Sequence, residues 1–322
     1  MRGLPSAGRG TALALLALVV SVAAGCSPQR FVANRVAGTL AAGGDTYAAD
    51  DDPELVAAAL PFSLKLMESV LASTPEHRGL LSATSAAFTQ YAWGFVQQEA
   101  DAAAFEDVER AWAGWNRARR LYLRARDYGL RGLDSVHPGF SDALRHAPAA
   151  AITRAGAADV DLLYWTAAAW AAAIALGKDD PALVADLPLV SALIDRAEAV
   201  AGDWGRGAIP TFQITFVMVR PDAPADRQAA AQAYFDRALA LSGGLDVGPW
   251  LNWAEAVCLP REDRACFETS LQQALALDPD AHPPTRLANL VQQRRAGWLL
   301  AHVDRWILPP LDESGNEGEP AR

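Results

Sequence analysis

The residue with the clearest chemistry is Cys26, which ends the run VAAGC at residues 22–26. Small residues directly before a cysteine are typical of the site where a bacterial lipoprotein signal is cleaved and the thiol is joined to diacylglycerol. Two arginines give the leader a positive start, and its apolar stretch is shorter than the roughly 18 residues of a membrane-spanning helix. The sequence therefore predicts a signal peptide over residues 1–25 and a lipid anchor on Cys26.

The alternative is an ordinary secretory signal with an incidental cysteine, because Ala23 stands where lipoproteins more often carry leucine. Either signal exports the mature chain. Ser27 follows the cysteine where an aspartate would favour retention, so sorting to the outer membrane is favoured over the inner. We expect a periplasmic protein that is held at a membrane by lipid.

Two further cysteines, Cys258 and Cys266, lie close together near the C-terminus. In an oxidising periplasm two neighbouring cysteines can close a small disulfide loop. Two free thiols are the alternative, and the sequence does not decide between them.

Motifs for catalysis or cofactor binding are not found. The sequence has no Gly-rich phosphate loop, no Gly-x-Ser-x-Gly elbow and no pair of histidines on one helical turn. The five histidines are scattered near turns and are interpreted as surface or capping residues: His77, His137, His146, His282 and His302. We expect no enzyme activity, no cofactor and no metal.

Clustered carboxylates are interpreted in the same way. The run DDDP at residues 50–53 predicts a helix start, with aspartate as N-cap and proline in the first turn. Binding of a metal is the weaker alternative, because neighbouring side chains diverge and no second ligand cluster is visible. Asp159 and Asp161 are likewise predicted to cap a helix.

Charge and hydropathy exclude two classes of partner. The chain has 322 residues and a formal net charge of −10 at pH 7, without a basic run. Such a chain is a poor candidate for binding nucleic acid or for a second, electrostatic contact with anionic lipid. After the leader no apolar run reaches membrane length, so the protein is expected to be tethered rather than to span a bilayer.

The elements that must position these residues are predicted to be helices. Apolar residues recur with helical spacing, and Gly or Pro punctuates the joins. We predict an all-α fold with a lipidated tether over 26–45, a helical-repeat domain over 46–308 and a disordered tail over 309–322. A first helix is expected from Pro53 onward, with Leu60, Leu64, Met67 and Leu71 on one face and a kink at Pro61. Further helices are expected near residues 79–98, 104–129, 159–177, 186–201, 208–219, 225–242, 247–258, 264–277 and 284–306.

Four helical segments share one local pattern: GWNRARRL at 114–121, LIDRAEAV at 193–200, YFDRALAL at 234–241 and SLQQALAL at 270–277. Their spacing and their small alanine between large apolar residues are typical of tetratricopeptide-type helix pairs. The equivalent alanines are Ala118, Ala197, Ala238 and Ala274. A methyl group there lets neighbouring helices approach closely.

Aromatic residues are the other distinctive set, since the chain has ten tryptophans. For any single one, a place in the core between helices is the simpler interpretation. The alternative is that some line a concave apolar cavity, with uncharged polar residues orienting a ligand head group. The candidates are Gln90, Tyr91, Trp93, Phe95, Tyr164, Trp165, Trp250, Asn252 and Trp253.

Several segments together resemble a known family. They are DDDPELVAAALPFSLKLMES, FTQYAWGFV, LYLRARDYGLRGL, LLYWTAAAWAAAIAL and TRLANLVQQRRAGWLLAHVD, which extend from roughly Val36 to Trp306. The chain is similar to the T-component lipoproteins associated with TRAP transporters. The resemblance implies four tetratricopeptide-like helix pairs around a hydrophobic pore. It also implies association with a periplasmic solute-binding protein, a homotrimer and an apolar small-molecule ligand.

Three functions remain open at this point. The first is an accessory subunit that docks a solute-binding protein and binds or conducts an apolar ligand. The second is a generic tetratricopeptide scaffold for envelope assembly without a ligand cavity. The third is a lipoprotein enzyme, which convergent carboxylates or histidines with perturbed pKa values in a cleft would favour.

Overall fold

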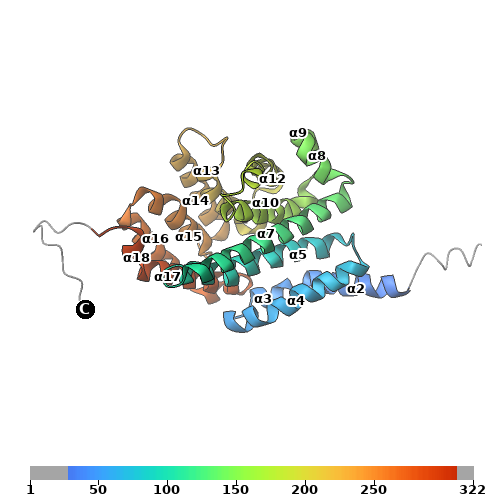
Figure 1. The fold of residues 1–322 in the computed structure, drawn as a ribbon, viewed down its shortest axis with the longest axis horizontal. Coiled ribbons are helices and arrows are strands. Elements are labelled where there is room, and N and C mark those ends of the chain that lie inside the picture. The colour runs from blue at the N-terminus through green and yellow to red at the C-terminus, as the bar shows by residue number, and fades with distance from the viewer. Residues whose placement is uncertain (1–27, 310–322) are drawn as a thin grey trace, which may run out of the picture.

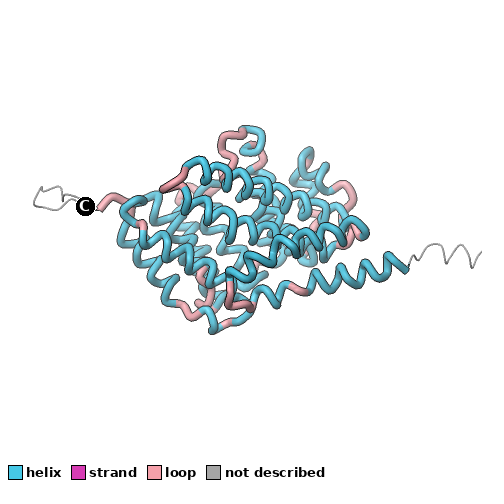
Figure 2. The backbone as a smooth tube through the Cα atoms, turned by 60° about the horizontal axis from the view of Figure 1, so that its bottom comes forward, coloured by secondary structure: helices cyan, strands magenta, loops and turns pink. Residues whose placement is uncertain are grey.

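The computed structural model describes residues 28–309, and all regular structure within them is helical. The all-α prediction is therefore confirmed. Figure 1 shows the chain starting at the lower right with α2 (Pro28–Ala42), α3 (Gly44–Ala48) and α4 (Pro53–Ser73) and ending at the left. Figure 2 shows that the helices run side by side and are joined by short loops. The segment 310–322 of the predicted tail, together with Cys26, lies outside the described residues.

Most of the central helices lie within a few residues of the predicted segments, but α7 ends at Val136 where the prediction ended at 129. The central helices are α5 (Arg78–Tyr91), α6 (Gln98–Ala103), α7 (Val108–Val136), α10 (Val160–Ala175), α12 (Leu187–Ala201), α13 (Ala208–Val219), α14 (Arg227–Ser242), α15 (Gly248–Trp253), α16 (Arg264–Ala276) and α17 (Arg286–Ala301). Shorter helices are α8 (Phe140–His146), α9 (Pro148–Ile152), α11 (Pro181–Val184) and α18 (Val303–Trp306). Two π-helical segments, η1 (Ala92–Gln97) and η4 (Ala254–Cys258), extend α5 and α15.

Most of the expected tether is a helix. Residues 28–42 form α2, which packs along α4 and α5. Ala37 is fully buried in a small cluster with Leu71, Leu80 and Leu81. Leu40 of α2 also packs against this cluster, so residues 28–42 of the predicted tether are helical and lie on the domain, while the lipidated tether over 26–45 stays a prediction. The helix start at the acidic run is as expected: the amide of Leu55 donates to Asp52 Oδ1 at 2.9 Å.

The long helix α7 lies at the centre, with α5 on one side and α10 on the other. Two glycines allow it to approach α10 closely. A methyl group at Gly129 would collide with Thr166, and one at Gly132 would collide with Leu162. These glycines cost helix propensity of roughly 1 kcal/mol each relative to alanine, and the close crossing of the two helices offsets that cost.

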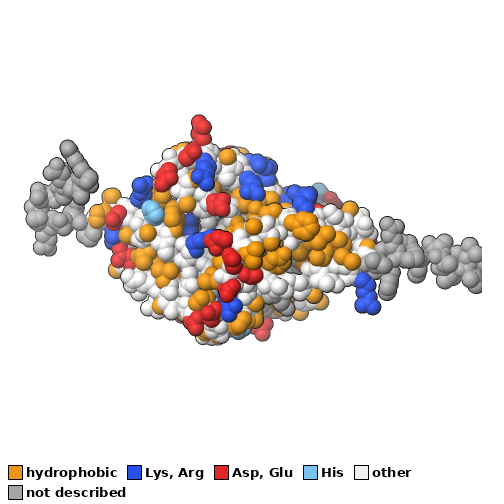
Figure 3. Space-filling view, turned by 90° about the horizontal axis from the view of Figure 1, so that it is seen from below, with side chains coloured by type: hydrophobic (Ala, Val, Ile, Leu, Met, Phe, Trp, Pro, Cys, Tyr) orange, Lys and Arg blue, Asp and Glu red, His pale blue; other side chains and the backbone are white. Residues whose placement is uncertain are grey.

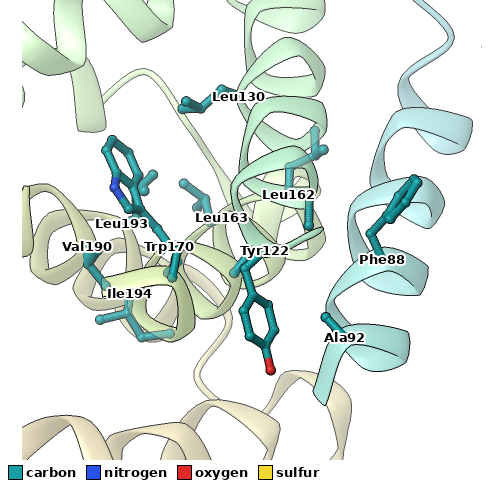
Figure 4. Packing of buried hydrophobic residues seen from close by; sticks show 14 of the residues in the cluster. Phe88, Ala92, Tyr122, Leu130, Leu162, Leu163, Trp170, Val190, Leu193 and Ile194 are labelled. Atoms are coloured by element: carbon teal, nitrogen blue, oxygen red, sulfur yellow. The ribbon is translucent and has the colours of Figure 1, made fainter. Parts of the chain in front are cut away.

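The largest core cluster joins α5, α7, α10 and α12, and Figure 4 shows its packing. Tyr122 from α7 and Trp170 from α10 are fully buried in it. The guanidinium groups of Arg126 and Arg145 lie 5.1 and 5.6 Å from the Trp170 ring centroid. The core is thus sealed towards solvent by arginine side chains that also contribute cation–π attraction.

The C-terminal helix α17 returns to the N-terminal helices. Arg286 Nη1 donates to the carbonyl of Ala49 at 3.2 Å, and Arg294 Nη1 lies 3.2 Å from Glu54 Oε1. These contacts bring the last long helix of the described chain against α3 and α4. The helical array therefore closes on itself instead of remaining open at its ends.

The four repeat alanines share one environment. Ala118, Ala197, Ala238 and Ala274 each have 0% exposed surface. Full burial of all four agrees with the close helix approach that the sequence alignment required. The tetratricopeptide-like arrangement itself stays a prediction.

Enlarging one of these alanines is expected to destabilise the fold. Ala238→Leu or Ala274→Leu should lower the free energy of unfolding by about 1–3 kcal/mol, because the added atoms overpack a helix crossing. Ala233→Leu is the matched control, since Ala233 lies on the exposed side of the same helix α14. Urea unfolding measures both. Equal stability of all three variants would show that the alanine positions are misaligned.

Candidate functional site

The aromatic candidates on α10 form one group. Tyr164 contacts Trp165 and Trp204 with ring centroids 4.9 Å apart, and Phe212 lies 6.3 Å away. Burial raises the pKa of Tyr164 to about 12. All four side chains nevertheless keep part of their accessible surface. This group is enclosed by protein without being packed as tightly as Trp170, on the same helix.

The candidates on α15 form a second group. Trp250 and Trp253 both pack against Phe235 of α14, with ring centroids 4.9 and 5.2 Å away. Both tryptophans are half-buried. Asn252 lies between them in sequence, and its Nδ2 donates to the carbonyl of Thr211 at 2.8 Å. The amide donor of Asn252 therefore holds α15 against α13.

The candidates at the end of α5 are more dispersed. Tyr91 and Phe95 are buried in the main core, with ring centroids 6.1 Å apart. Trp93 is half-buried and packs against both the main core and the cluster formed by α15, α16 and α17. Gln90 is exposed. The structure thus places Trp93 at a junction between two cores, and Tyr91 and Phe95 inside one of them.

A charged cluster that the sequence did not reveal lies beside Trp115 and Trp298. Arg295 of α17 contacts Asp101 Oδ2 through Nη1 at 2.9 Å and Glu255 Oε1 through Nη2 at 2.7 Å. The guanidinium also lies 4.9 Å from the ring centroid of Trp298. Trp115 Nε1 donates to Asp101 Oδ1 at 2.7 Å. We call Asp101, Glu255 and Arg295 the charged cluster.

The charged cluster contains two carboxylates and a single cation. Burial raises the pKa of Glu255, and the positive charge of Arg295 offsets only part of that rise. Burial opposes the charge of Arg295, but Glu255 and Asp101 outweigh it and raise the Arg295 pKa. The Glu255 side chain retains 30% of its exposure. It is therefore the member that can accept a proton or a hydrogen bond from another molecule.

Both π-helical segments adjoin the charged cluster. Glu255 itself belongs to η4, and Asp101 follows η1 in α6. Arg294, next to the cluster arginine, donates from Nη2 to the carbonyl of Gly94 in η1 at 3.2 Å. Single π turns inside helices are frequent at functional sites. No short-range sequence pattern marks them, because Asp101, Glu255 and Arg295 meet only through the helix crossings.

A second buried carboxylate has a structural role. Asp159 Oδ2 accepts from the amide of Gly156 at 2.9 Å and lies 3.0 Å from His137 Nε2, while Arg78 Nε is 3.8 Å from Oδ1. Its side chain makes no capping bond to the helix that follows. Asp159 therefore caps the 3-10 turn η2 (Ala157–Asp159) that leads into α10, through the amide of Gly156, instead of α10 itself, and it also joins α5 and the end of α7.

The structure joins Cys258 and Cys266 in a disulfide, with Cα atoms 5.5 Å apart. The bond links the end of η4 to the first turn of α16. Among residues 28–309 no group of three or more His, Cys, Asp or Glu side chains is arranged to hold a metal ion.

Thiol chemistry tests the disulfide in solution. The native protein purified without reductant should take up no thiol reagent at Cys258 or Cys266, and reduction should release two thiols. Loss of the bond should lower the free energy of unfolding by about 2–3 kcal/mol, since a short loop is no longer closed in the unfolded chain. Labelling of both cysteines before reduction would show that the bond is absent.

The fold and these contacts define a class: an all-helical array in which Trp93 and Trp253 each lie where two core clusters meet, and in which a charged cluster contacts Trp115 and Trp298. The family model described as TRAP transporter T-component matches residues 49–306. A protein of Treponema pallidum (strain Nichols), described as an uncharacterized protein, is 30% identical over 266 residues, which are 81% of this chain and 82% of that protein.

The chain belongs to the TRAP transporter T-component family. The resemblance carried by the sequence segments is thereby confirmed. Membership makes the protein an accessory component of a TRAP transport system, with a membrane-associated or periplasmic location.

Proposed function

We propose that this protein is a non-enzymatic periplasmic lipoprotein, anchored at Cys26, that docks the solute-binding protein of a TRAP transporter and binds an apolar ligand within its helical array. The observation that carries the ligand proposal is the set of half-buried aromatic side chains, of which Trp115 and Trp298 contact the charged cluster. Family membership supports the transport role. A homotrimer, a tetratricopeptide-like arrangement and a place at the outer membrane belong to the same proposal.

The aromatic groups supply surface for an apolar tail. Trp93, Trp253 and Trp298 pack against one core cluster, and each retains accessible surface. Covering such surface with a ligand gains roughly 25 cal/mol per Å² of apolar area. Rings held in place by their neighbours lose little conformational freedom on binding, which favours affinity.

The charged cluster selects the head group of that ligand. A carboxylate placed beside Glu255 would meet two existing negative charges and one cation that is already engaged by both. Repulsion between like charges in a poorly solvated site is costly. We therefore propose a neutral or cationic head group that donates a hydrogen bond to Glu255.

The alternative is a docking scaffold without a ligand cavity. The two functions differ in whether an apolar molecule is bound, because in a scaffold the aromatic groups would be purely structural. Native mass spectrometry of the protein extracted from its own envelope decides between them. A co-purified apolar molecule that is lost on Glu255→Gln or Trp253→Ala supports binding, whereas mass of protein and anchor alone favours the scaffold.

Docking is tested by affinity capture of the lipidated protein from envelope extract. A periplasmic solute-binding protein should be recovered in constant proportion, and mass spectrometry of the captured chain should show an N-terminus at Cys26 with added acyl mass. A soluble chain that begins elsewhere would end the lipoprotein proposal. Recovery of the chain alone, from cells that express the transporter, would end the docking proposal.

We extend the proposed binding surface to the separate aromatic group on α10, where two tryptophans provide a matched pair for a test. Trp165→Ala should weaken ligand retention and leave the melting midpoint nearly unchanged, because a half-buried wall residue has few partners to lose. Trp170→Ala should cost about 3–5 kcal/mol, since the ring is fully buried. Circular dichroism measures both. A large loss of stability in Trp165→Ala would assign that residue to the core.

A further inference from the structure

The outer side of α4 carries large apolar side chains. Leu55, Phe62 and Leu66 are 59%, 73% and 38% exposed. At about 100° per residue they fall on one line along the helix, within roughly 40° of one another. Figure 3 looks onto this side of the molecule from below and shows hydrophobic side chains gathered there. We call these three residues the apolar line of α4.

The fold does not account for the apolar line. Val56, Leu64 and Leu71 bury the opposite side of α4 against the other helices. Within residues 28–309, α4 is also the one helix long and apolar enough to cross a membrane, and only 17% of its most apolar window is buried. A helix on a soluble surface normally turns polar side chains outward. If α4 spanned a bilayer, Val56, Leu64 and Leu71 would lose their contacts with the core. We therefore consider an apolar partner that contacts only the outer side of the helix.

The position of α4 relative to the N-terminus indicates what that partner is. The helix lies beside α2 in Figures 1 and 2, and the two are in contact. α2 begins at Pro28, two residues after Cys26. A two-residue link reaches roughly 7 Å at most, so acyl chains on Cys26 would hold the start of α2 close to the bilayer. We propose that the apolar line of α4 then rests in the interface of a phospholipid bilayer.

This proposal rests on the lipid anchor of the proposed function and adds a second contact to it. An anchor at one end of α2 does not fix the orientation of the protein relative to the bilayer. The apolar line favours the orientation in which α4 lies against the bilayer surface. Three side chains in a row are too narrow for a stable protein interface of about 800 Å² per partner. They suit shallow insertion, because an interfacial helix buries only its outer side chains in the boundary of the acyl chains.

The orientation has a consequence for docking. Figure 1 shows α8, α9, α12 and α13 on the edge opposite α2 and α4. With the apolar line on the bilayer, this opposite edge faces the periplasm, where a soluble binding protein arrives.

The test uses the full mature lipidated protein with a Phe62→Cys variant labelled with an environment-sensitive fluorophore. Vesicles contain phosphatidylethanolamine and phosphatidylglycerol, some with a quencher on the acyl chain. The matched control is Val219→Cys, because Val219 is 60% exposed on α13 at the opposite edge. Emission should shift to the blue and be quenched by vesicles at position 62 only.

Three results would overturn the proposal. One is an aqueous emission at position 62 while the protein floats with the vesicles. Another is a blue-shifted emission at position 62 in the absence of vesicles, if the shift increases with protein concentration. That result would assign the apolar line to contact with a second copy of the chain. The third is an unmodified Cys26, detected by mass spectrometry, which would also remove the anchor. Capture of the solute-binding protein does not require α4, so docking stands or fails separately.

A combined variant measures the contribution of the apolar line. Leu55→Gln, Phe62→Gln and Leu66→Gln together should leave lipidation and the melting midpoint unchanged. In the mature chain made without acyl groups, where the multi-chain anchor no longer holds the protein on the membrane, they should lower retention on the same vesicles about tenfold, because the apolar line then supplies the contact with the bilayer. The control is a different triple variant on an exposed part of α14, in which Gln232, Asp236 and Arg237 are each replaced by alanine. Equal retention of both variants would contradict the proposal.

Discussion

Replacing Arg295 with methionine is expected to lower the free energy of unfolding by about 3–5 kcal/mol, because it leaves Asp101 and Glu255 facing each other without a cation. The Arg295 side chain is 12% exposed, so water replaces little of the lost interaction. Urea unfolding at pH 7 measures the effect. A matched control is Arg294→Met, since Arg294 is 45% exposed and should cost less than about 1 kcal/mol.

The pH dependence of this variant follows from Glu255. Its pKa is raised in the folded protein, so the stability that a neutral Glu255 contributes is fully present below its ordinary value of 4.5. That contribution is lost as pH rises through the folded pKa. Without Arg295 the pKa of Glu255 should rise further, so the loss of stability with rising pH should be larger. The defect of Arg295→Met should therefore be small near pH 4, grow towards pH 7, and be partly rescued by Glu255→Gln. A defect that is independent of pH would show that the cluster is hydrated.

Asp159→Asn is expected to cost about 3 kcal/mol, because Asp159 is 4% exposed and its removal leaves Arg78 and His137 without their shared buried counter-charge. Burial opposes ionisation of Asp159, but the amide of Gly156 together with His137 and Arg78 outweighs it and lowers the pKa below 3.8. This stabilisation is present above the ordinary pKa and is lost as pH falls through the lowered one.

The defect of Asp159→Asn should accordingly be constant at neutral pH and shrink only well below pH 4. Asp161→Asn is the matched control: Asp161 also pairs with Arg78, at 2.6 Å, but is 29% exposed and should cost about 1 kcal/mol or less. Thermal unfolding over a pH series measures both. Similar costs for the two substitutions would mean that Asp159 is no better shielded from water than Asp161.

The two carboxylate sites have different meanings for function. Asp159 has a lowered pKa, and its partners are Arg78, His137 and the amide of Gly156. These properties are typical of a structural ion pair. Glu255 has a raised pKa, keeps accessible surface and belongs to a π-helical segment, and its partner Arg295 lies over the half-buried ring of Trp298. A group with that combination is a candidate contact for a ligand, and it is the one that the proposed function uses.

The sequence by itself determined the helices, because the signals that define them are local. The expected segment 208–219 matches α13, and 264–277 differs from α16 by a single residue at its end. Helical periodicity, an aspartate before a proline and a glycine at a join act within a few residues of one another. The family, too, could be recognised, since its segments follow one another in order along the chain.

The sequence did not determine α2, the two π-helical segments or the charged cluster. Ala37 holds α2 in place only because it packs against Leu71, Leu80 and Leu81, and the local sequence around residue 37 does not predict these contacts. The aromatic candidates show the same limit. Trp165 and Trp170 lie five residues apart on the same helix α10, yet only Trp170 is fully buried.

The physical reason is the range over which each interaction acts. Backbone hydrogen bonds and caps join neighbours in sequence, whereas Asp101, Glu255 and Arg295 come together only when α17 closes the array against η1 and η4. The same closure decides how much surface each tryptophan keeps and what pKa Glu255 adopts. Residue types set what chemistry is available to this protein, and the tertiary packing decides which side chains share a site.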